Sequence, residues 1–401
     1  MKDNHSGENR TSPTFIRRAD YMALPPHERA HYRPVNPRYE RIPVACFVIY
    51  GLSVVCLILY ILQRSLPAFA DFFNRYISSL GRALFAFVTG WIPFSVAECC
   101  LILIPLILVL TVRYASKYRC DTWRCVAVFL AIILSFALSI GCIFVLNFSA
   151  GYYGSPLSDK LDLDTENIQD DELYGTAYYL AAHLNELSEQ IDYGVDGFSD
   201  MPYSVSDMNQ HLMDGYAVIE QDAPYIPTLR SRVKPVFLSE GMSYLHITGV
   251  YSFFTGEANI NTAFPDFTVP YTAAHELAHQ RGIAREDEAN FIAFLVCLDS
   301  ADPYAQYSGY LNMFQYVGTA IYRLDPNEYR TLYYSLSPAV RKELGAYGEF
   351  FSKYENSAAG HVSGAINDAY LQSQGTPGNI SYDLVTRLMV GYYRDLPVQA
   401  H

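Results

Sequence analysis

The amino-acid sequence predicts a mostly α or α+β protein, in which three N-terminal transmembrane helices precede a domain with a small sheet and many helices. Long uncharged apolar segments near the N-terminus predict the membrane part, and helical periodicity near the C-terminus predicts the second part. The charges separate the two parts: residues 1–148 hold 15 Lys and Arg against 8 Asp and Glu, whereas residues 149–401 hold 13 against 33. Such a division is typical of a chain in two environments. The acidic half excludes nucleic acid as a partner, because phosphate would repel it.

The predicted membrane spans are residues 43–62, 91–112 and 125–148. The first and third are uncharged runs of 20 and 24 residues, and about 20 apolar residues in a helix cross the ~30 Å hydrocarbon core of a bilayer. The second span contains Glu98 and Pro105. No small-residue cleavage site follows the first span, so we expect it to remain as an anchor.

Basic residues predict the orientation of the spans. The arm over residues 1–42 and the short loop between the second and third spans are rich in Lys and Arg, which favours the cytoplasm. The expected location is therefore the cytoplasmic membrane, with an extracytoplasmic part that consists of a linker over 149–171 and a folded domain over 172–401. Apolar residues recur at helical spacing over 63–90, which is predicted to lie along the outer membrane surface.

Periodicity also predicts the elements of the outer domain in order. Helices are expected over 172–191 and 203–221, and short strands over 233–238 and 245–254. A loop is expected over 259–270. The rest of the chain is predicted to form helices over 271–281, 286–300, 304–323, 337–354, 361–373 and 381–394. Few strands followed by many helices are typical of an α+β or mostly α domain.

One segment, His275-Glu276-Leu277-Ala278-His279, has the pattern of a metal site. Residues four apart share a face of a helix, so both imidazoles can reach one ion. Glu276 lies ~100° around the helix, where it can hold a water on that ion and act as its general base. The alternative, two histidines on the surface of a helix, is disfavoured by the small apolar neighbours and by Gly282, a natural helix terminator.

A catalytic zinc ion needs a third protein ligand and one open position. The acidic helix start Glu286-Asp287-Glu288-Ala289-Asn290 follows at once and offers candidates for that ligand. Glu286 and Glu288 are ~200° apart on one helix, so both cannot point at the same ion.

These residues resemble the gluzincin metallopeptidases, in several of which the next helix begins E-x-x-A-D or E-x-x-A-N. The resemblance implies Glu286 as the third zinc ligand and Asn290 as a residue that orients a ligand histidine. Only six residues separate His279 from Glu286, far fewer than in thermolysin-like enzymes, so Glu288 stays a competitor. More closely, the layout resembles an uncharacterised family of bacterial three-span membrane proteins that carry H-E-x-A-H-x-x-G-x-x-x-E-x-E-A-N-F.

The resemblance implies a zincin-like domain and a membrane-anchored metallopeptidase. Zn2+ would be held by His275, His279 and Glu286, and Glu276 would activate water against the bonds of a peptide or protein substrate. The first alternative is a zinc-binding ectodomain that acts in envelope sensing or assembly without proteolysis, and the second is a metal-free structural membrane protein.

Further residues are candidates for substrate binding. In zincins an edge strand before the metal helix binds the substrate, and Tyr244–Phe254 is the candidate here, although an ordinary core strand explains it equally well. Glu257, Asn259 and Asn261 could line the cleft, or could simply form a turn. Tyr316 and Tyr322 are candidate donors to an oxyanion.

Overall fold

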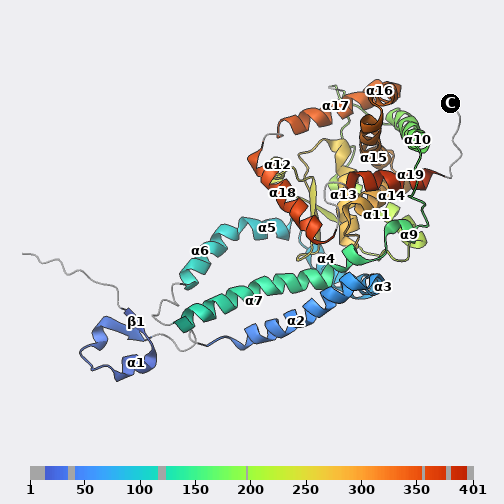
Figure 1. The fold of residues 1–401 in the computed structure, drawn as a ribbon. Coiled ribbons are helices and arrows are strands. Elements are labelled where there is room, and N and C mark those ends of the chain that lie inside the picture. Colours follow the sequence, from blue (N-terminus) through green and yellow to red (C-terminus); the bar gives the residue numbers. More distant parts are fainter. Residues whose placement is uncertain are drawn as a thin grey trace, which may run out of the picture. The chain divides into compact units, whose positions relative to one another are not determined.

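The computed structural model divides into two compact units, which are described separately (Figure 1). The first comprises Met1–Leu57 with Cys100–Cys142, and the second Ile58–Cys99 with Ile143–His401. The structure describes residues 14–34, 41–115, 123–195, 197–354, 357–375 and 381–394. Parts of the predicted cytoplasmic arm and loop, residues 1–13, 35–40 and 116–122, therefore lie outside the described residues.

Most of each candidate membrane helix lies in the first unit. Before these helices the unit has four short elements, β1 (Thr14–Ile16), α1 (Arg18–Ala23), η1 (Arg29–His31) and β2 (Tyr32–Pro34). Helices α2 (Val44–Ser65) and α7 (Trp123–Asn147) are long and apolar enough to cross a membrane. The third candidate is a pair, α5 (Val96–Ile102) and α6 (Ile104–Ala115), with a 51° bend between its two parts. Pro105 lies at that break and lacks the N–H that a continuous helix would require. The chain thus has two or three helices that indicate membrane association.

The second unit is mostly helical with one small sheet, as predicted. Its elements continue from the apolar helix α2 and pack around one large core and a smaller cluster that includes Phe148 and Tyr152. Before the bent pair they are α3 (Pro67–Phe72), the π-helix η3 (Phe73–Ser78) and α4 (Ser79–Gly90). After α7 they are α8 (Ala150–Tyr153), α9 (Leu157–Lys160), α10 (Asp170–Ser188), α11 (Val205–Asp222), β3 (Val233–Pro235), α12 (Ser239–Tyr244), β4 (Gly249–Ser252), β5 (Glu257–Ile260), η5 (Asp266–Thr268), α13 (Val269–Gln280), α14 (Glu286–Asp299), α15 (Pro303–Leu324), α16 (Pro326–Ser335), α17 (Pro338–Ser352), α18 (Ala358–Ser373) and α19 (Ser381–Tyr393).

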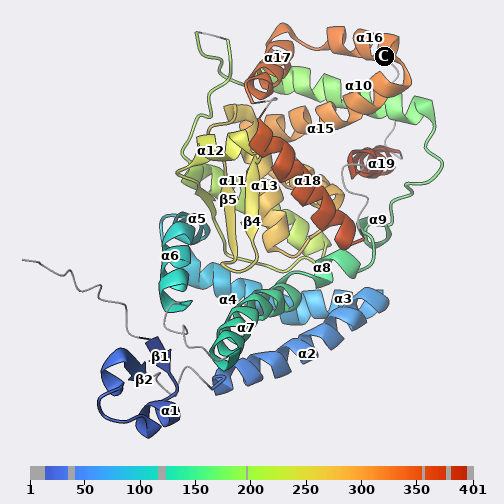
Figure 2. The ribbon, with the colours of Figure 1, turned by 60° about the vertical axis from the view of Figure 1, so that its left-hand side comes forward.

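The sheet has three strands in the order β3-β5-β4, so that β4 lies at an edge (Figure 2). Strand β5 is parallel to β3 and antiparallel to β4. The prediction of a loop from residue 259 was wrong, because Asn259 and Ile260 belong to β5. Its sequence, Glu-Ala-Asn-Ile, has little β propensity. The strand is nevertheless completely buried, and the side chain of Asn259 donates to the main-chain oxygens of Val250 and Glu257.

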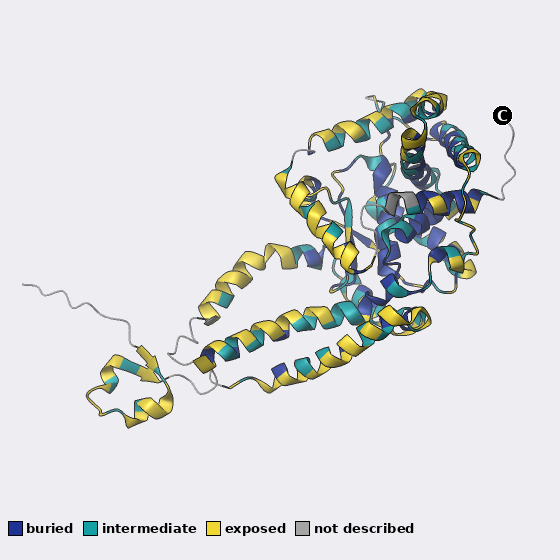
Figure 3. Ribbon diagram, viewed as in Figure 1, coloured by how far each residue is buried: buried dark blue, intermediate teal, exposed yellow. Residues whose placement is uncertain are grey.

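Two other segments differ from the predictions. The predicted strand over 245–254 shortens to β4, because a turn with His246 in the left-handed conformation (φ 58°) precedes it. The predicted linker over 149–171 contains α8 and α9, and Leu157 lies in the core. The buried residues concentrate in the second unit, above all in α13 and α14 (Figure 3).

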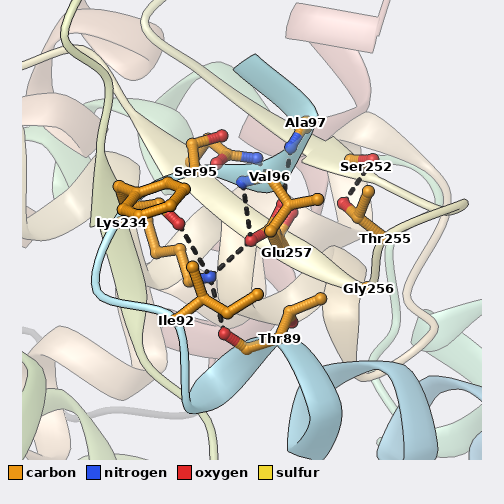
Figure 4. A network of polar contacts seen from close by, with 12 residues as sticks. Thr89, Ile92, Ser95, Val96, Ala97, Lys234, Ser252, Thr255, Gly256 and Glu257 are labelled. Atoms are coloured by element: carbon orange, nitrogen blue, oxygen red, sulfur yellow. Dashed lines mark hydrogen bonds and ion pairs between the residues drawn. The ribbon is translucent and has the colours of Figure 1, made fainter. Parts of the chain in front are cut away.

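A buried ion pair joins the sheet to the segment before α5. Lys234 of β3 contacts Glu257 of β5, and its ammonium also donates to the carbonyls of Thr89 and Phe94 (Figure 4). Glu257 accepts the main-chain N–H groups of Val96 and Ala97 at 3.0 and 2.8 Å. The sheet therefore fixes the place where the chain turns from α4 into the bent pair.

Candidate metal centre

The candidate metal centre lies on a helical hairpin formed by α13 and α14. Helix α13 is buried over nearly its whole length, in keeping with its small apolar residues. It ends in a Schellman motif: Gly282 has a φ of +92°, its N–H bonds to His279, and the N–H of Ile283 bonds to Ala278. This tight loop reverses the chain, so that the first residues of α14 lie beside the last two helical turns of α13.

The hairpin brings His275, His279 and Glu286 together. Nε2 of His275 lies 3.2 Å from one carboxylate oxygen of Glu286, and Nε2 of His279 lies 3.6 Å from the other. One ligand atom from each of the three residues can be chosen so that all lie within 4.8 Å of one another. Ligand atoms ~2.0–2.2 Å from a tetrahedral zinc ion are about 3.3–3.6 Å apart, and the two separations to Glu286 are close to that spacing, so these residues could hold a metal ion.

The protonation state of these three side chains is also compatible with a bound cation. Burial lowers the pKa of His279, but the neighbouring carboxylate of Glu286 outweighs it and raises that pKa to about 9. The pKa of Glu286 is held well below its usual range, because both histidines outweigh the effect of burial. Without a metal a proton therefore compensates the carboxylate, and a cation can take that proton's place.

His279 is oriented by the turn that follows it. Its Nδ1 lies 2.7 Å from the carbonyl oxygen of Ile283, which accepts a hydrogen bond and leaves Nε2 free to bind a metal. The ring of Phe148 packs edge-on against it, with 6.0 Å between the centroids. Nδ1 of His275 is buried with no hydrogen-bond partner in the described structure.

Glu276 lies beside this cluster on the side of the sheet. Its carboxyl group is buried against Gly249 of β4, where a Cβ atom would come within 2.6 Å of it. One of its oxygens, Oε2, has no hydrogen-bond partner among the described residues. Burial raises the pKa of Glu276 to about 6, although both histidines act in the opposite direction. Glu276 is therefore a buried carboxyl with a free acceptor atom.

Glu288, the competing third ligand, makes different contacts. Its Oε1 accepts the main-chain N–H of Leu157 at 2.9 Å and the guanidinium of Arg285 at 3.2 Å. Burial raises the pKa of Glu288 to about 7. The side-chain oxygen of Asn290 accepts a hydrogen bond from the hydroxyl of Tyr271 at 3.1 Å, whereas the orienting contact of His279 comes from the backbone oxygen of Ile283.

The two glutamates give a matched pair of variants for zinc binding. We expect Glu286→Gln to lower zinc affinity by about 10- to 100-fold or more, because it weakens a ligand that lies between both imidazoles. Glu288→Gln should leave zinc affinity within about twofold, because its carboxylate faces Leu157 and Arg285. Competition with a chromogenic chelator measures both. The reverse order of affinities would make Glu288 the ligand.

Comparison with protein families places this hairpin in a wider segment. The DUF3810 family, described as a protein of unknown function, matches residues 70–390, which begin in α3 and end in α19. The chain belongs to the DUF3810 family. No curated protein and no solved structure matches it.

In this DUF3810 protein the turn that follows α13, residues 281–283, is held by residues distant in sequence, and it is called the metal turn below because it follows the candidate ligand His279. Arg82 of α4 is fully buried and donates to the carbonyl oxygens of Arg281, Asn147 and Asn74. Asn74 donates in turn to the carbonyl of Gly282 at 2.9 Å. A Cβ atom on Gly282 would meet the guanidinium of Arg82 at 2.4 Å, so only glycine leaves room for it.

Sequence reasoning missed these supporting residues. A single Arg in an otherwise apolar helix could have indicated Arg82, because a buried guanidinium must find hydrogen-bond acceptors. Two tyrosines, Tyr152 of α8 and Tyr370 of α18, are linked by a 3.1 Å hydrogen bond and interact electrostatically with Glu286. No sequence signal distinguishes them among the 34 tyrosines of the DUF3810 chain.

The remaining candidates lie as follows. Glu257 is paired with Lys234, and Asn261 donates to Ser243 and to the carbonyl of Ile247, so both hold the backbone around the sheet. Tyr316 interacts with Tyr271. Tyr322 is more than half exposed and packs against Tyr329.

Proposed function

We propose that this DUF3810 protein is a membrane-anchored, zinc-dependent metallopeptidase. The observation that carries the proposal is the cluster of His275, His279 and Glu286, with separations of 3.2 and 3.6 Å, beside the free carboxyl oxygen of Glu276. A purely structural zinc site would be closed by a fourth ligand and would need no such base.

His275, His279 and Glu286 would hold the ion. A bound zinc ion supplies a Lewis acid that polarises a carbonyl and lowers the pKa of water to about 7. Glu276 accepts a proton at Oε2 and returns it to the leaving amine, for which its buried, unpaired oxygen is suited. The side chain of Glu286 is 32% exposed, against 13% for His275 and 8% for His279, so Glu286 is the most exposed of the three candidate ligands.

Strand β4 supports a peptide substrate. It is an edge strand, and its Gly249 lies directly against Glu276. An extended peptide that pairs with such an edge gains main-chain hydrogen bonds and little sequence selectivity. In this proposal the helical unit is zincin-like and lies on the extracytoplasmic side, because the basic arm and loop favour the cytoplasm.

Metal removal tests the proposal. The full chain, purified in detergent, should hydrolyse members of a broad peptide library when loaded with zinc, lose that activity with a chelator, and regain it when zinc is restored. The full chain is needed because Asn74 and Arg82 hold the metal turn. A protein that binds zinc tightly but cleaves no peptide would instead favour the non-proteolytic ectodomain.

A further inference from the structure

The segment α3–η3–α4 has two distinct faces. One face is buried against the rest of the second unit, to which the segment itself belongs, and consists of Ala70, Phe73, Ser78, Arg82 and Ala86. The five-residue step from Phe73 to Ser78 falls in the π-helix η3, which keeps this face aligned. The opposite face is apolar and exposed along its whole length, and it consists of Phe72, Tyr76, Leu80, Leu84, Phe87 and Trp91.

The exposed apolar face is continuous with a candidate membrane helix. Trp91 is 77% exposed and is followed, five residues later, by Val96 at the start of α5. Glu98 of α5 accepts the main-chain N–H groups of Phe237 and Leu238, and the side chain of Phe237 is 88% exposed. An exposed apolar surface of this extent, joined to a membrane helix, is suited to the lipid interface.

The C-terminal ends of α2 and α7 contact each other within the second unit. Gln63, near the end of α2, contacts both the carbonyl of Val145 and the hydroxyl of Ser149. Tyr60 of α2 bonds to Tyr153 of α8 at 2.8 Å. Residues 145–153 therefore lie where two helices that are apolar enough to span a membrane end.

The candidate metal centre lies directly on these residues. Phe148 packs against the ring of His279. Gly151 lies so close to the metal turn that a Cβ atom on it would meet the carbonyl oxygen of Gly282 at 2.4 Å. From the other side, Arg82 reaches the same turn from the buried face of α4. Only the thickness of α4 separates the turn from the exposed apolar face, and a helix with its side chains is ~10 Å across.

We propose that α3–η3–α4 lies in the membrane interface with its apolar face in the lipid, and that the substrate is a polypeptide anchored in the same membrane. The second statement rests on the proposed function. The bond that is cleaved lies within about one helix diameter, ~10 Å, of the membrane surface, because the metal turn is one helix away from the lipid.

The position of α4 can be measured without any activity. The chain has two tryptophans, Trp91 and Trp123, so Trp123→Phe leaves Trp91 as a single reporter. In vesicles with bromine-labelled lipid chains, we expect several-fold quenching of Trp91 fluorescence. The matched control places the reporter on exposed α16, as Tyr334→Trp with both native tryptophans replaced by Phe. Equal, weak quenching of both reporters would overturn the placement of α4.

The substrate class is tested with one cleavable sequence in three settings. It is anchored in the vesicle membrane by a spacer of about three residues (~10 Å), anchored by about 20 residues (~65 Å), or left free in solution. We expect the short-spacer substrate to be cleaved at least as fast as the long one, and about tenfold or more faster than the free peptide. Glu276→Gln controls for other peptidases.

The outcomes separate the two proposals. Cleavage of the free and long-spacer substrates without the short one would overturn the membrane-proximal site and leave the peptidase proposal intact. No cleavage of any substrate by zinc-loaded protein would remove both the peptidase proposal and the substrate class, whereas the Trp91 measurement would still decide where α4 lies.

Discussion

Glu276→Gln is expected to lower the rate of peptide hydrolysis by about 10²- to 10⁴-fold, which is the range for removal of a general base. Gln keeps the shape of the side chain, so it still fits against Gly249 of β4. It can no longer accept and return a proton. Zinc should stay bound, because the three candidate ligands are untouched, and metal content is measured on the same sample as the rate.

Glu288→Gln is the matched control for this variant. Both glutamates are buried and lie on the two helices of one hairpin, but Glu288 faces Leu157 and Arg285. Its variant should retain hydrolysis within about threefold. If Glu276→Gln hydrolyses peptides as fast as the control, Glu276 is not the base. If it loses zinc as well as activity, the rate says nothing specific about proton transfer, and a zinc-saturated assay must separate the two effects.

Local sequence patterns predicted those helices and turns whose formation depends on residues that are neighbours in the sequence. The helix from Val269 ends where Gly282 permits a left-handed residue, and α14 begins at an acidic helix start. Strand β5 was missed because tertiary contacts stabilise it: Lys234 pairs with Glu257, and the side-chain amide of Asn259 donates to the backbone of Val250. Lys234 lies 23 residues before Glu257, outside a local window of sequence around that residue.

The same distinction applies to the candidate site. Spacing alone placed His275 and His279 on one face and left Glu286 and Glu288 open. The contacts of Glu288 with Leu157 and Arg285 could not be predicted, since Leu157 lies 131 residues away. The support from Arg82 likewise joins positions 199 residues apart. A division of the chain at residue 149 would separate that support from the site.

Lys234→Met is expected to destabilise the second unit by about 3–5 kcal/mol, because it leaves the carboxylate of Glu257 buried without its cation. The side chains of both residues are almost completely buried. The carbonyls of Thr89 and Phe94 lose their donor at the same time. Thermal unfolding of the full chain in detergent measures the loss as a lower melting temperature.

The exposed pair Lys353–Glu240 provides the control, since its charges are 3.9 Å apart and both side chains are more than 60% exposed. Lys353→Met should leave the melting temperature unchanged, because water already solvates both charges. Combining Lys234→Met with Glu257→Gln should cost less than the sum of the two single changes, since the second removes the charge that the first leaves unpaired. Equal melting temperatures for Lys234→Met and Lys353→Met would mean that the buried pair contributes no more to stability than the exposed pair does.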